Sequence, residues 1–373
     1  MKHLFLYIGV LILSTIACNA QKTEQVESRE VLKSNKTSNN FKPLKTVFEL
    51  NLEADVNNDS ILTEQEYRDF QFVGIRRNRF KEFSGYYKRI TDIPYAAGGE
   101  EHQKLDVIIP VNRTASSLPV IIFVHGGGWK KGDKCDGYPL LDDFLKEGNY
   151  IGVSINYRLT NEAKWPAQLH DCKAAIRWVK ANAEMYGIDK EKIGLWGTSA
   201  GGHLVSMLAV TANNERFEGV VGSHLTESAS VTCAINGFGP SDLMLEGTLL
   251  NKVVYNDFSD PGYNVFNLIG VEDLKQKAKN ASPIYWVHNN VPPFLSYHGV
   301  LDEGVPIKHS DRLHEKLKAK GAKDAYLLRI ENMEHGHGGG KFTETTRYLF
   351  NFFERFLREK PIKIDAITTL KQP

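Results

Sequence analysis

The chain has 373 residues, of which 42% are hydrophobic and 24% are charged, and its formal net charge at pH 7 is +1. This composition is typical of a globular protein, and the length leaves room for one large α/β domain and one small unit. No basic stretch is interleaved with aromatic residues, so the sequence argues against nucleic-acid binding.

The first twenty residues predict export. A charged start, Met1-Lys2-His3, is followed by the apolar residues 4–13, which is the pattern of a signal peptide and too short for a membrane-spanning helix. Cleavage before Cys18 would leave a lipidated N-terminus, and cleavage after Ala20 would leave a soluble one. Either alternative predicts a periplasmic, cell-surface or secreted protein, whose only membrane contact would be a lipid on Cys18.

Three further cysteines, Cys135, Cys172 and Cys233, allow at most one disulfide. Cys172 lies in a helical pattern and Cys233 in a strand pattern. Buried free thiols are therefore expected rather than a disulfide scaffold.

Residues 21–43 are polar and predict a disordered tether, and residues 44–84 predict a small helical unit. Within that unit, residues 55–66 have the spacing of an EF-hand calcium loop. Its oxygen ligands would come from Asp55, Asn57, Asp59, the Ile61 carbonyl and Glu66. Ser60 stands where the sharp turn prefers glycine, so a weak structural Ca²⁺ site and an acidic surface turn both remain open.

Strand patterns and helical patterns alternate through residues 85–360. Strands are predicted at residues 104–110, 118–124, 150–157, 192–196, 230–237, 293–298 and 325–330, and helices at residues 166–183, 202–210, 308–320 and 343–360. The alternation predicts an α/β fold with a mostly parallel sheet and helices on both faces. The active site of such a fold lies beyond the carboxyl ends of the strands. Residues 243–290 are expected to form an excursion over that site, and residues 361–373 a C-terminal tail.

The segment Gly197-Thr198-Ser199-Ala200-Gly201 stands between a predicted strand and a predicted helix. This is the context of a nucleophile elbow, in which glycines permit a sharp turn and a serine is lifted clear of the sheet. The serine would lie at a helix N-terminus, where backbone N–H groups favour negative charge. Ser199 is therefore the predicted nucleophile.

A second glycine-rich segment, His125-Gly126-Gly127-Gly128-Trp129, follows the apolar strand at residues 118–124. Backbone N–H groups in such a segment point into the space where an oxyanion forms during acyl transfer. The two glycine motifs together are more specific than either one alone.

A serine nucleophile needs a base to accept its proton and a carboxylate to orient that base. Asp302 and His337 each follow a predicted strand, and the chain order Ser199, Asp302, His337 is that of an α/β-hydrolase. This chemistry requires no metal or other cofactor.

The two glycine motifs, Asn156-Tyr157-Arg158-Leu159, Trp165 to Gln168, Asp171 to Trp178, Phe238-Gly239-Pro240, residues 298–306 and His337-Gly338 together resemble the hormone-sensitive-lipase-like bacterial carboxylesterases. The resemblance covers about residues 88–358 and is strongest to the feruloyl and acetyl xylan esterases. It implies an α/β-hydrolase fold and a serine esterase acting on short acyl esters attached to polysaccharides.

The resemblance also implies the role of each site residue. Ser199 would be the nucleophile, His337 the base, and Asp302 the orienting carboxylate, with an oxyanion hole made by the N–H groups of Gly126, Gly127 and Ala200. Glu303 is the alternative carboxylate and His335 the alternative base; His337 is favoured because glycines follow it, as in the family motif. His125 and His298 are expected to be structural turn residues.

Other functions remain to be weighed. A serine peptidase or a small-amide hydrolase could use the same fold and residues, and a catalytically inactive cell-surface binding module is an alternative of another class. The complete triad favours an enzyme whose partner is a small ester or an acylated carbohydrate.

Overall fold

A computed structural model of the chain describes residues 86–98, 100–245, 265, 267–270, 272–336 and 344–371. All of them belong to the second of the two units into which the chain divides, residues 71–373. The predicted signal peptide with Cys18, the tether and the EF-hand-like unit lie outside the described residues. The same is true of the predicted calcium ligands Asp55, Asn57, Asp59, Ile61 and Glu66.

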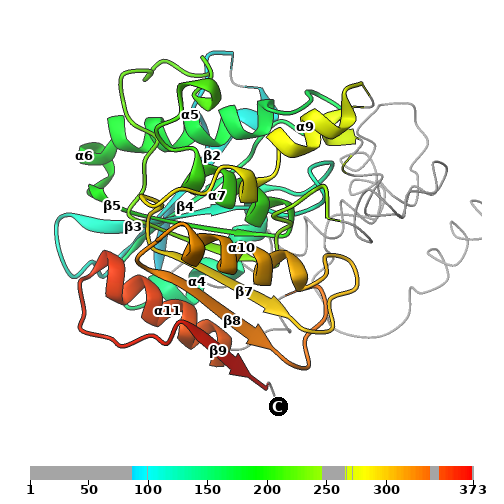
Figure 1. Cartoon of the computed structure of the whole chain (residues 1–373). Coiled ribbons are helices and arrows are strands. Elements are labelled where there is room, and N and C mark those ends of the chain that lie inside the picture. Colours follow the sequence, from blue (N-terminus) through cyan, green and yellow to red (C-terminus); the bar gives the residue numbers. More distant parts are fainter. Residues whose placement is uncertain are drawn as a thin grey trace, which may run out of the picture. The chain divides into compact units, whose positions relative to one another are not determined.

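The described residues form a nine-stranded sheet in the order β1-β2-β4-β3-β5-β6-β7-β8-β9 (Figure 1). The strands are β1 (Tyr87–Pro94), β2 (Lys104–Pro110), β3 (Leu118–Val124), β4 (Ile151–Ile155), β5 (Ile188–Thr198), β6 (Cys233–Gly237), β7 (Phe294–Gly299), β8 (Ala325–Ile330) and β9 (Ile367–Leu370). β2 pairs antiparallel with β1 and β4, and every pairing from β4 to β9 is parallel. The parallel strands therefore bring their carboxyl ends to one edge.

Helices cover both faces of the sheet. The α-helices are α4 (Tyr138–Leu145), α5 (Ala167–Ala181), α6 (Ala183–Tyr186), α7 (Ala200–Val210), α9 (Leu274–Asn280), α10 (Lys308–Ala319) and α11 (Glu344–Leu357), and the 3-10 turns are η1 (Glu101–Gln103), η2 (Lys134–Gly137), η3 (Glu215–Phe217) and η4 (Pro283–Tyr285). The apolar side chains of α5, α7 and α10 share one buried cluster, and those of α4 and α11 share another. The sheet lies between these two clusters.

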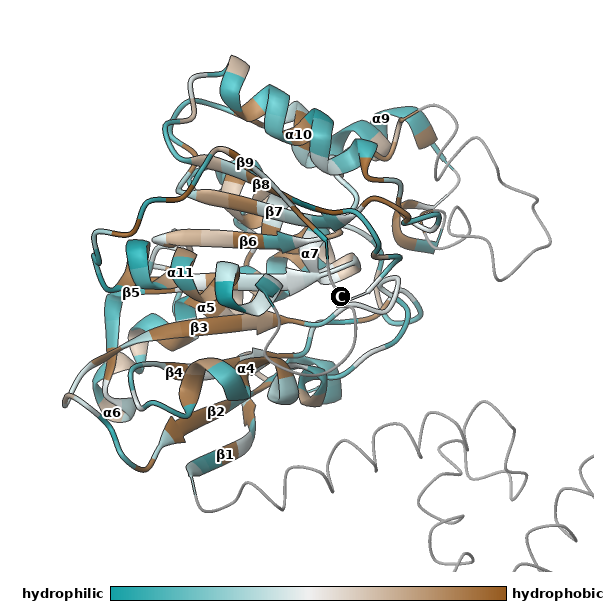
Figure 2. Cartoon of the chain, turned by 90° about the horizontal axis from the view of Figure 1, so that it is seen from below, coloured by the Kyte–Doolittle hydropathy of each residue, from teal (hydrophilic) through white to brown (hydrophobic). Residues whose placement is uncertain are grey.

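The central strands have apolar sequences because both of their faces are buried. Val120, Ile122 and Val124 of β3 belong to the cluster of α5, α7 and α10, whereas Ile121 and Phe123 belong to that of α4 and α11. Because both faces are buried, β3 is hydrophobic at nearly every position, and Figure 2 shows it in brown. The prediction of a mostly parallel sheet with helices on both faces is confirmed.

The predicted elements occur in the predicted order. The strands at residues 104–110, 118–124 and 325–330 have the predicted ends, and β5 is longer than predicted because it begins at Ile188. Cys135, Cys172 and Cys233 are buried, and none of these three forms a disulfide.

The assignment of residues 361–373 as a tail is wrong, because they include β9. This strand continues the sheet parallel to β8, with Leu327 opposite Ile367. β9 is only four residues long, and Ile367 is 55% exposed. A strand at this partly exposed edge needs no apolar run, and its sequence lacks the pattern that marks the buried strands.

Candidate active site

Ser199 occupies the one-residue turn between β5 and α7. Its φ of 53° is a conformation that residues other than glycine rarely adopt, at a cost of about 1–3 kcal/mol. The Ser199 N–H donates to the Gly237 carbonyl at 2.8 Å, and the Ser199 carbonyl accepts from the His203 N–H at 3.0 Å. These bonds to β6 and α7 hold the serine in the strained turn at the carboxyl edge of the sheet.

The glycines of the elbow are required by close backbone contacts. A Cβ at Gly197 would lie 2.4 Å from the Gly201 carbonyl oxygen, and a Cβ at Gly201 would lie 2.1 Å from the Val124 carbonyl oxygen. Both distances are far inside van der Waals contact. α7 can therefore pack against the ends of β3 and β5 only where these side chains are absent.

The loop after β3 lies directly against the serine. A Cβ at Gly126 would be 2.9 Å from the Thr198 carbonyl oxygen and 3.3 Å from Ser199 Cβ. Gly127 has a φ of 105°, and its carbonyl accepts from the N–H groups of Lys130 and Lys131. Ala200 is the first residue of α7, where helix N–H groups lack intrahelical acceptors. The structure thus brings the predicted oxyanion-hole segments, Gly126-Gly127 and Ala200, to the same serine.

Two buried histidines support this loop. Trp129 donates its indole N–H to His203 Nδ1 at 3.2 Å, and His203 Nε2 donates to the Ala281 carbonyl at 2.6 Å. This pattern requires the neutral Nε2–H tautomer, and burial lowers the pKa of His203 to about 4. His125 is fully buried and stacks on the Tyr157 ring, which agrees with the predicted structural role.

His335 joins the serine to a buried carboxylate. Its Nε2 lies 2.9 Å from Ser199 Oγ, and its Nδ1 lies 2.7 Å from Asp302 Oδ2. An ionised carboxylate can only accept, so Nδ1 carries the proton and Nε2 is free to accept from the serine hydroxyl. The Phe238 ring contacts the imidazole edge to face, with ring centroids 4.9 Å apart.

Among the described residues, the histidine in contact with the serine is thus His335, the alternative base, and not the base that the family motif favours. His337 lies outside the described residues. The physical reason lies in the loop after β8: Met333 is held against the loop after β7, because its carbonyl accepts from the Leu301 N–H at 3.0 Å. The residue that reaches Asp302 is two positions after this contact. Both histidines precede a glycine, so the His-Gly pattern could not choose between them.

Asp302, and not Glu303, is the carboxylate beside the imidazole. Its Oδ1 accepts from the Val305 N–H at 2.7 Å, and its Oδ2 accepts from His335 and, at 3.1 Å, from His298 Nε2. Burial alone would raise the pKa of this carboxyl, but the hydrogen bonds from His298, His335 and Val305 hold it well below its usual range. Glu303 is exposed.

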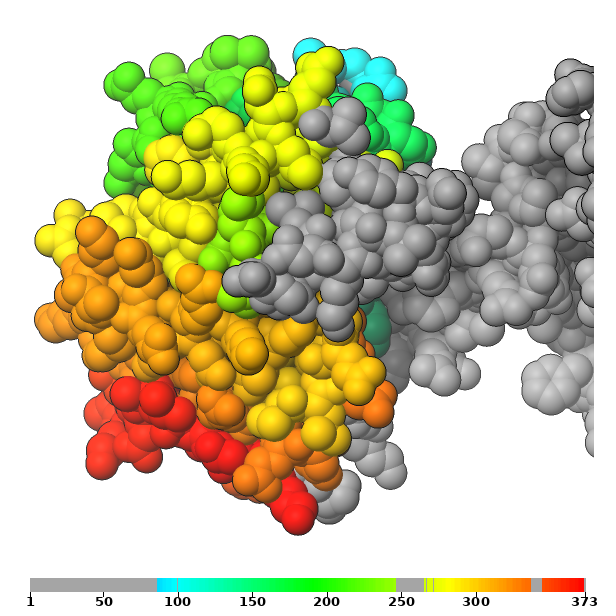
Figure 3. Space-filling view, turned by 45° about the vertical axis from the view of Figure 1, so that its right-hand side comes forward, coloured from blue at the N-terminus to red at the C-terminus, as the bar shows by residue number. Residues whose placement is uncertain are grey.

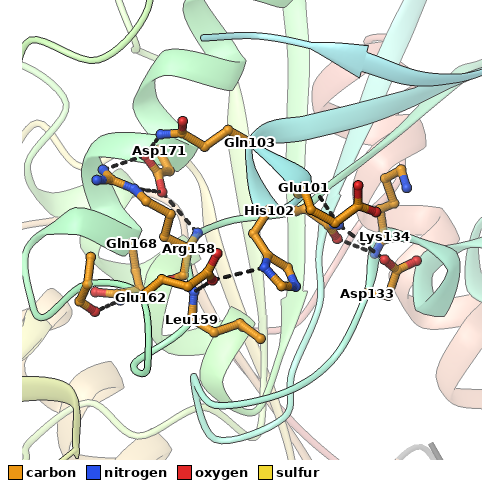
Figure 4. A network of polar contacts seen from close by, with 12 residues as sticks. Glu101, His102, Gln103, Asp133, Lys134, Arg158, Leu159, Glu162, Gln168 and Asp171 are labelled. Carbon is orange, nitrogen blue, oxygen red and sulfur yellow. Dashed lines mark hydrogen bonds and ion pairs between the residues drawn. The ribbon is translucent and has the colours of Figure 1, made fainter. Parts of the chain in front are cut away.

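A polar network centred on the buried Asp171 supports the segment after β4 (Figure 4). Arg158 Nε and Nη2 each donate to the Asp171 carboxylate at 2.8 Å, and the Arg158 N–H donates to the same group at 2.9 Å. Gln103 Nε2 donates to Asp171 Oδ1 at 2.9 Å. Asp171 therefore ties α5 to the ends of β2 and β4, which gives the Asn156–Leu159 and Asp171–Trp178 motifs a structural role.

Two of the surface depressions on the described part of the chain are not lined by the residues around Ser199. One, of about 300 Å³, is lined by Asp242, Ile284, Tyr285, Arg312, Glu315, Lys316 and Ala319, partly on the surface of α10, which is orange in Figure 3. The other, of about 520 Å³, is lined by Val210, Asn213, Asn214, Glu215, Trp286, His288 and Asn290.

Within the described residues, no cluster of three or more potential metal-ligating side chains occurs. No helix in the same part of the chain is long and apolar enough to cross a membrane.

The sheet order and the serine elbow define an α/β-hydrolase. Comparison with known families then identifies the branch: a family model named BD-FAE matches residues 105–317, more than half of the chain, and the protein belongs to this family.

Several known relatives are described as esterases. Esterase LipC of Mycobacterium tuberculosis is 31% identical over 250 residues, which cover 64% of this chain and 58% of LipC. A solved structure described as a truncated form of a carbohydrate esterase from gut microbiota is 31% identical, with a TM-score of 0.65, and the match covers 73% of this chain and 97% of that one. The matched region is therefore a carboxylic ester hydrolase domain, although the chain spans less than two thirds of the length of LipC.

A third relative is an esterase solved in a covalently modified form. Esterase 2 of Thermogutta terrifontis, 25% identical with a TM-score of 0.60 over 74% of this chain and 96% of that one, was solved phosphonylated by sarin.

Proposed function

We propose that the protein hydrolyses carboxylic esters through Ser199, His335 and Asp302. The observation that carries this proposal is the continuous contact from Ser199 Oγ through the two nitrogens of His335 to the buried Asp302 carboxylate, at 2.9 and 2.7 Å. Nucleophile, base and orienting carboxylate stand in the order that serine hydrolysis requires.

In the first half of the reaction, Ser199 Oγ attacks the ester carbonyl while its proton passes to His335 Nε2. The oxyanion that forms lies between the helix N-terminus at Ala200 and the Gly126-Gly127 loop, whose backbone N–H groups stabilise its charge. The intermediate then collapses, the bond to the alcohol oxygen breaks, and His335 returns the proton to the leaving alcohol.

In the second half, a water molecule attacks the acyl-enzyme. His335 accepts a proton from that water, a second oxyanion forms in the same place, and the carboxylic acid leaves as Ser199 recovers its proton. Asp302 stays ionised throughout, because the hydrogen bonds to it favour its charged form.

A short acyl group attached to a carbohydrate is the proposed substrate class. The motifs that resemble the acetyl xylan and feruloyl esterases support it, together with the similarity to a structure described as a carbohydrate esterase. Acetylated and feruloylated xylo-oligosaccharides should give a higher kcat/KM than a p-nitrophenyl ester with an acyl chain of about ten carbons. A preference for the long chain would redirect the proposal to a lipase, and a preference for amides to a peptidase or amidase.

Export and calcium binding are proposed from the sequence alone. The signal-peptide pattern supports a protein secreted or anchored through Cys18, and the EF-hand spacing of residues 55–66 supports one structural Ca²⁺. Calorimetric titration of the full mature chain and its Asp55→Ala variant tests the metal site. The site is rejected if the wild type binds no Ca²⁺ at millimolar concentration.

A further inference from the structure

Asp302 is held by a second imidazole that the reaction itself does not use. His298 lies near the end of β7 and is completely buried. Its Nε2 lies 3.1 Å from Asp302 Oδ2 and 2.7 Å from the Val305 carbonyl oxygen. The same carboxylate oxygen therefore faces two histidines, of which only His335 reaches the serine.

The protonation of His298 follows from its partners. A carbonyl oxygen can only accept, so the contact to Val305 requires a proton on Nε2. Nδ1 lies 2.7 Å from Ser310 Oγ on α10, and the hydroxyl can donate its proton to an unprotonated Nδ1. In its neutral form His298 therefore carries its proton on Nε2, and this Nε2–H is shared between the Val305 carbonyl and the Asp302 carboxylate.

These contacts leave the carboxylate one orientation. Val305 N–H holds Oδ1 at 2.7 Å, while His298 approaches Oδ2 from inside the protein and His335 approaches it from the partly exposed side. If Asp302 turned about its side-chain bonds, it would lose the contacts to Val305 and His298 together. The direction of the His335 imidazole, and so its aim at Ser199, depends on that fixed carboxylate.

The other groups packed around His298 have different partners. His309, on α10, uses Nδ1 to accept from the N–H groups of Ser241 and Asp242. Phe238 contacts both His298 and His335 with its ring and brings no charge. Among the described residues, His298 is the side chain besides His335 that donates to Asp302.

We propose that His298 is a positioning residue for hydrolysis: it fixes Asp302 through Nε2–H, and Ser310 fixes its tautomer. This assigns His298 a role beyond that of a turn residue, and it rests on the proposed function of Ser199, His335 and Asp302. A carboxylate held only by Val305 and His335 would spend more time in orientations that misalign the base.

The test compares His298→Leu with His298→Gln on a small ester. Leucine fills the space of the imidazole but donates no hydrogen bond, whereas the glutamine amide can place an N–H near the position of Nε2. We expect leucine to lower kcat about 10- to 100-fold with KM within about twofold, because one hydrogen bond to a charged group is lost. Glutamine should recover kcat to within about fivefold of the wild type. His314→Leu, at a buried histidine on α10 and outside the site, is the matched control and should leave kcat unchanged.

Active-site titration with a fluorophosphonate separates the possible outcomes. Turnover per labelled site that is equal in the wild type and His298→Leu, with only the melting temperature lowered, would overturn the proposal and leave His298 structural. Equal kcat in the leucine and glutamine variants would also overturn it. If the wild type itself is not labelled at Ser199, the proposed function fails rather than the role of His298.

A measurement on the unaltered enzyme covers the case in which the leucine variant does not fold. In ¹⁵N-histidine-labelled protein at pH 7, the ring nitrogens of His298 should show the neutral Nε2–H tautomer, assigned by their change in Ser310→Ala. The Nδ1–H tautomer would contradict the proposal, because Nε2 could then no longer donate to Asp302.

Discussion

At the scale of single residues, the site depends on which atom of each side chain carries a proton. Ser199 and Asp302 could be predicted from the sequence, because each follows a strand whose end points to the same edge of the sheet. The base could not be predicted, since His335 and His337 both precede a glycine. The position of His335 depends on the contact between Met333 and the loop after β7, which no local pattern shows. His298 was predicted to be a turn residue, because no local pattern shows that its ring faces Asp302.

The first prediction, at this scale, concerns Asp302→Asn. The amide preserves the shape of the carboxylate but can present its NH₂ group to His335, which would favour the wrong tautomer of the base. We expect kcat to fall about 10⁴-fold with little change in KM, measured on a small ester with melting temperature as the folding control. A fall of less than tenfold would show that the carboxylate does not orient the base.

At the scale of elements, the turn between β5 and α7 joins the nucleophile to the fold. The strand-turn-helix pattern was predictable because glycine spacing and apolar periodicity are local properties. The pairing of β9 with β8 was not predictable, because the strand is short and alternates between exposed and partly buried residues.

The elbow itself yields the second prediction. In Gly201→Ala the new Cβ would lie 2.1 Å from the Val124 carbonyl oxygen, so α7 must move away from β3. We expect a loss of about 3 kcal/mol in the free energy of unfolding, measured by urea denaturation, and a lower rate of fluorophosphonate labelling. Wild-type stability and labelling in this variant would mean that the packing of α7 against β3 does not set the position of the serine.

At the scale of the whole molecule, buried histidines link the stability of the fold to pH. Burial lowers the pKa of His203 to about 4, and burial, together with the charge of nearby Arg312, lowers that of His309 to about 3. In the unfolded chain a histidine has a pKa of about 6.5, so between pH 7 and pH 5 the unfolded state binds protons that the folded state does not. Stability therefore falls as pH drops through this window, by about 2 kcal/mol for each of the two residues at pH 5. Asp302, whose pKa is lowered, acts in the same direction but only below about pH 4, where the unfolded carboxyl becomes protonated.

Urea unfolding at pH 7 and pH 5 checks this third prediction. His309→Gln should make the free energy of unfolding less dependent on pH, because it removes one buried histidine whose pKa is lowered, whereas replacement of the exposed His288 by glutamine should leave the dependence unchanged. An equal pH dependence in wild type and His309→Gln would exclude His309 as a source of acid instability.

The central claim is that His335 activates Ser199, and a comparison of His335→Ala with His337→Ala on one small ester tests it most directly. Because His335 Nε2 lies 2.9 Å from Ser199 Oγ, removing it should lower kcat by about 10⁴-fold or more in a protein that remains folded. His337→Ala should stay within about tenfold of the wild type. An inactive His337→Ala beside an active His335→Ala would contradict the account.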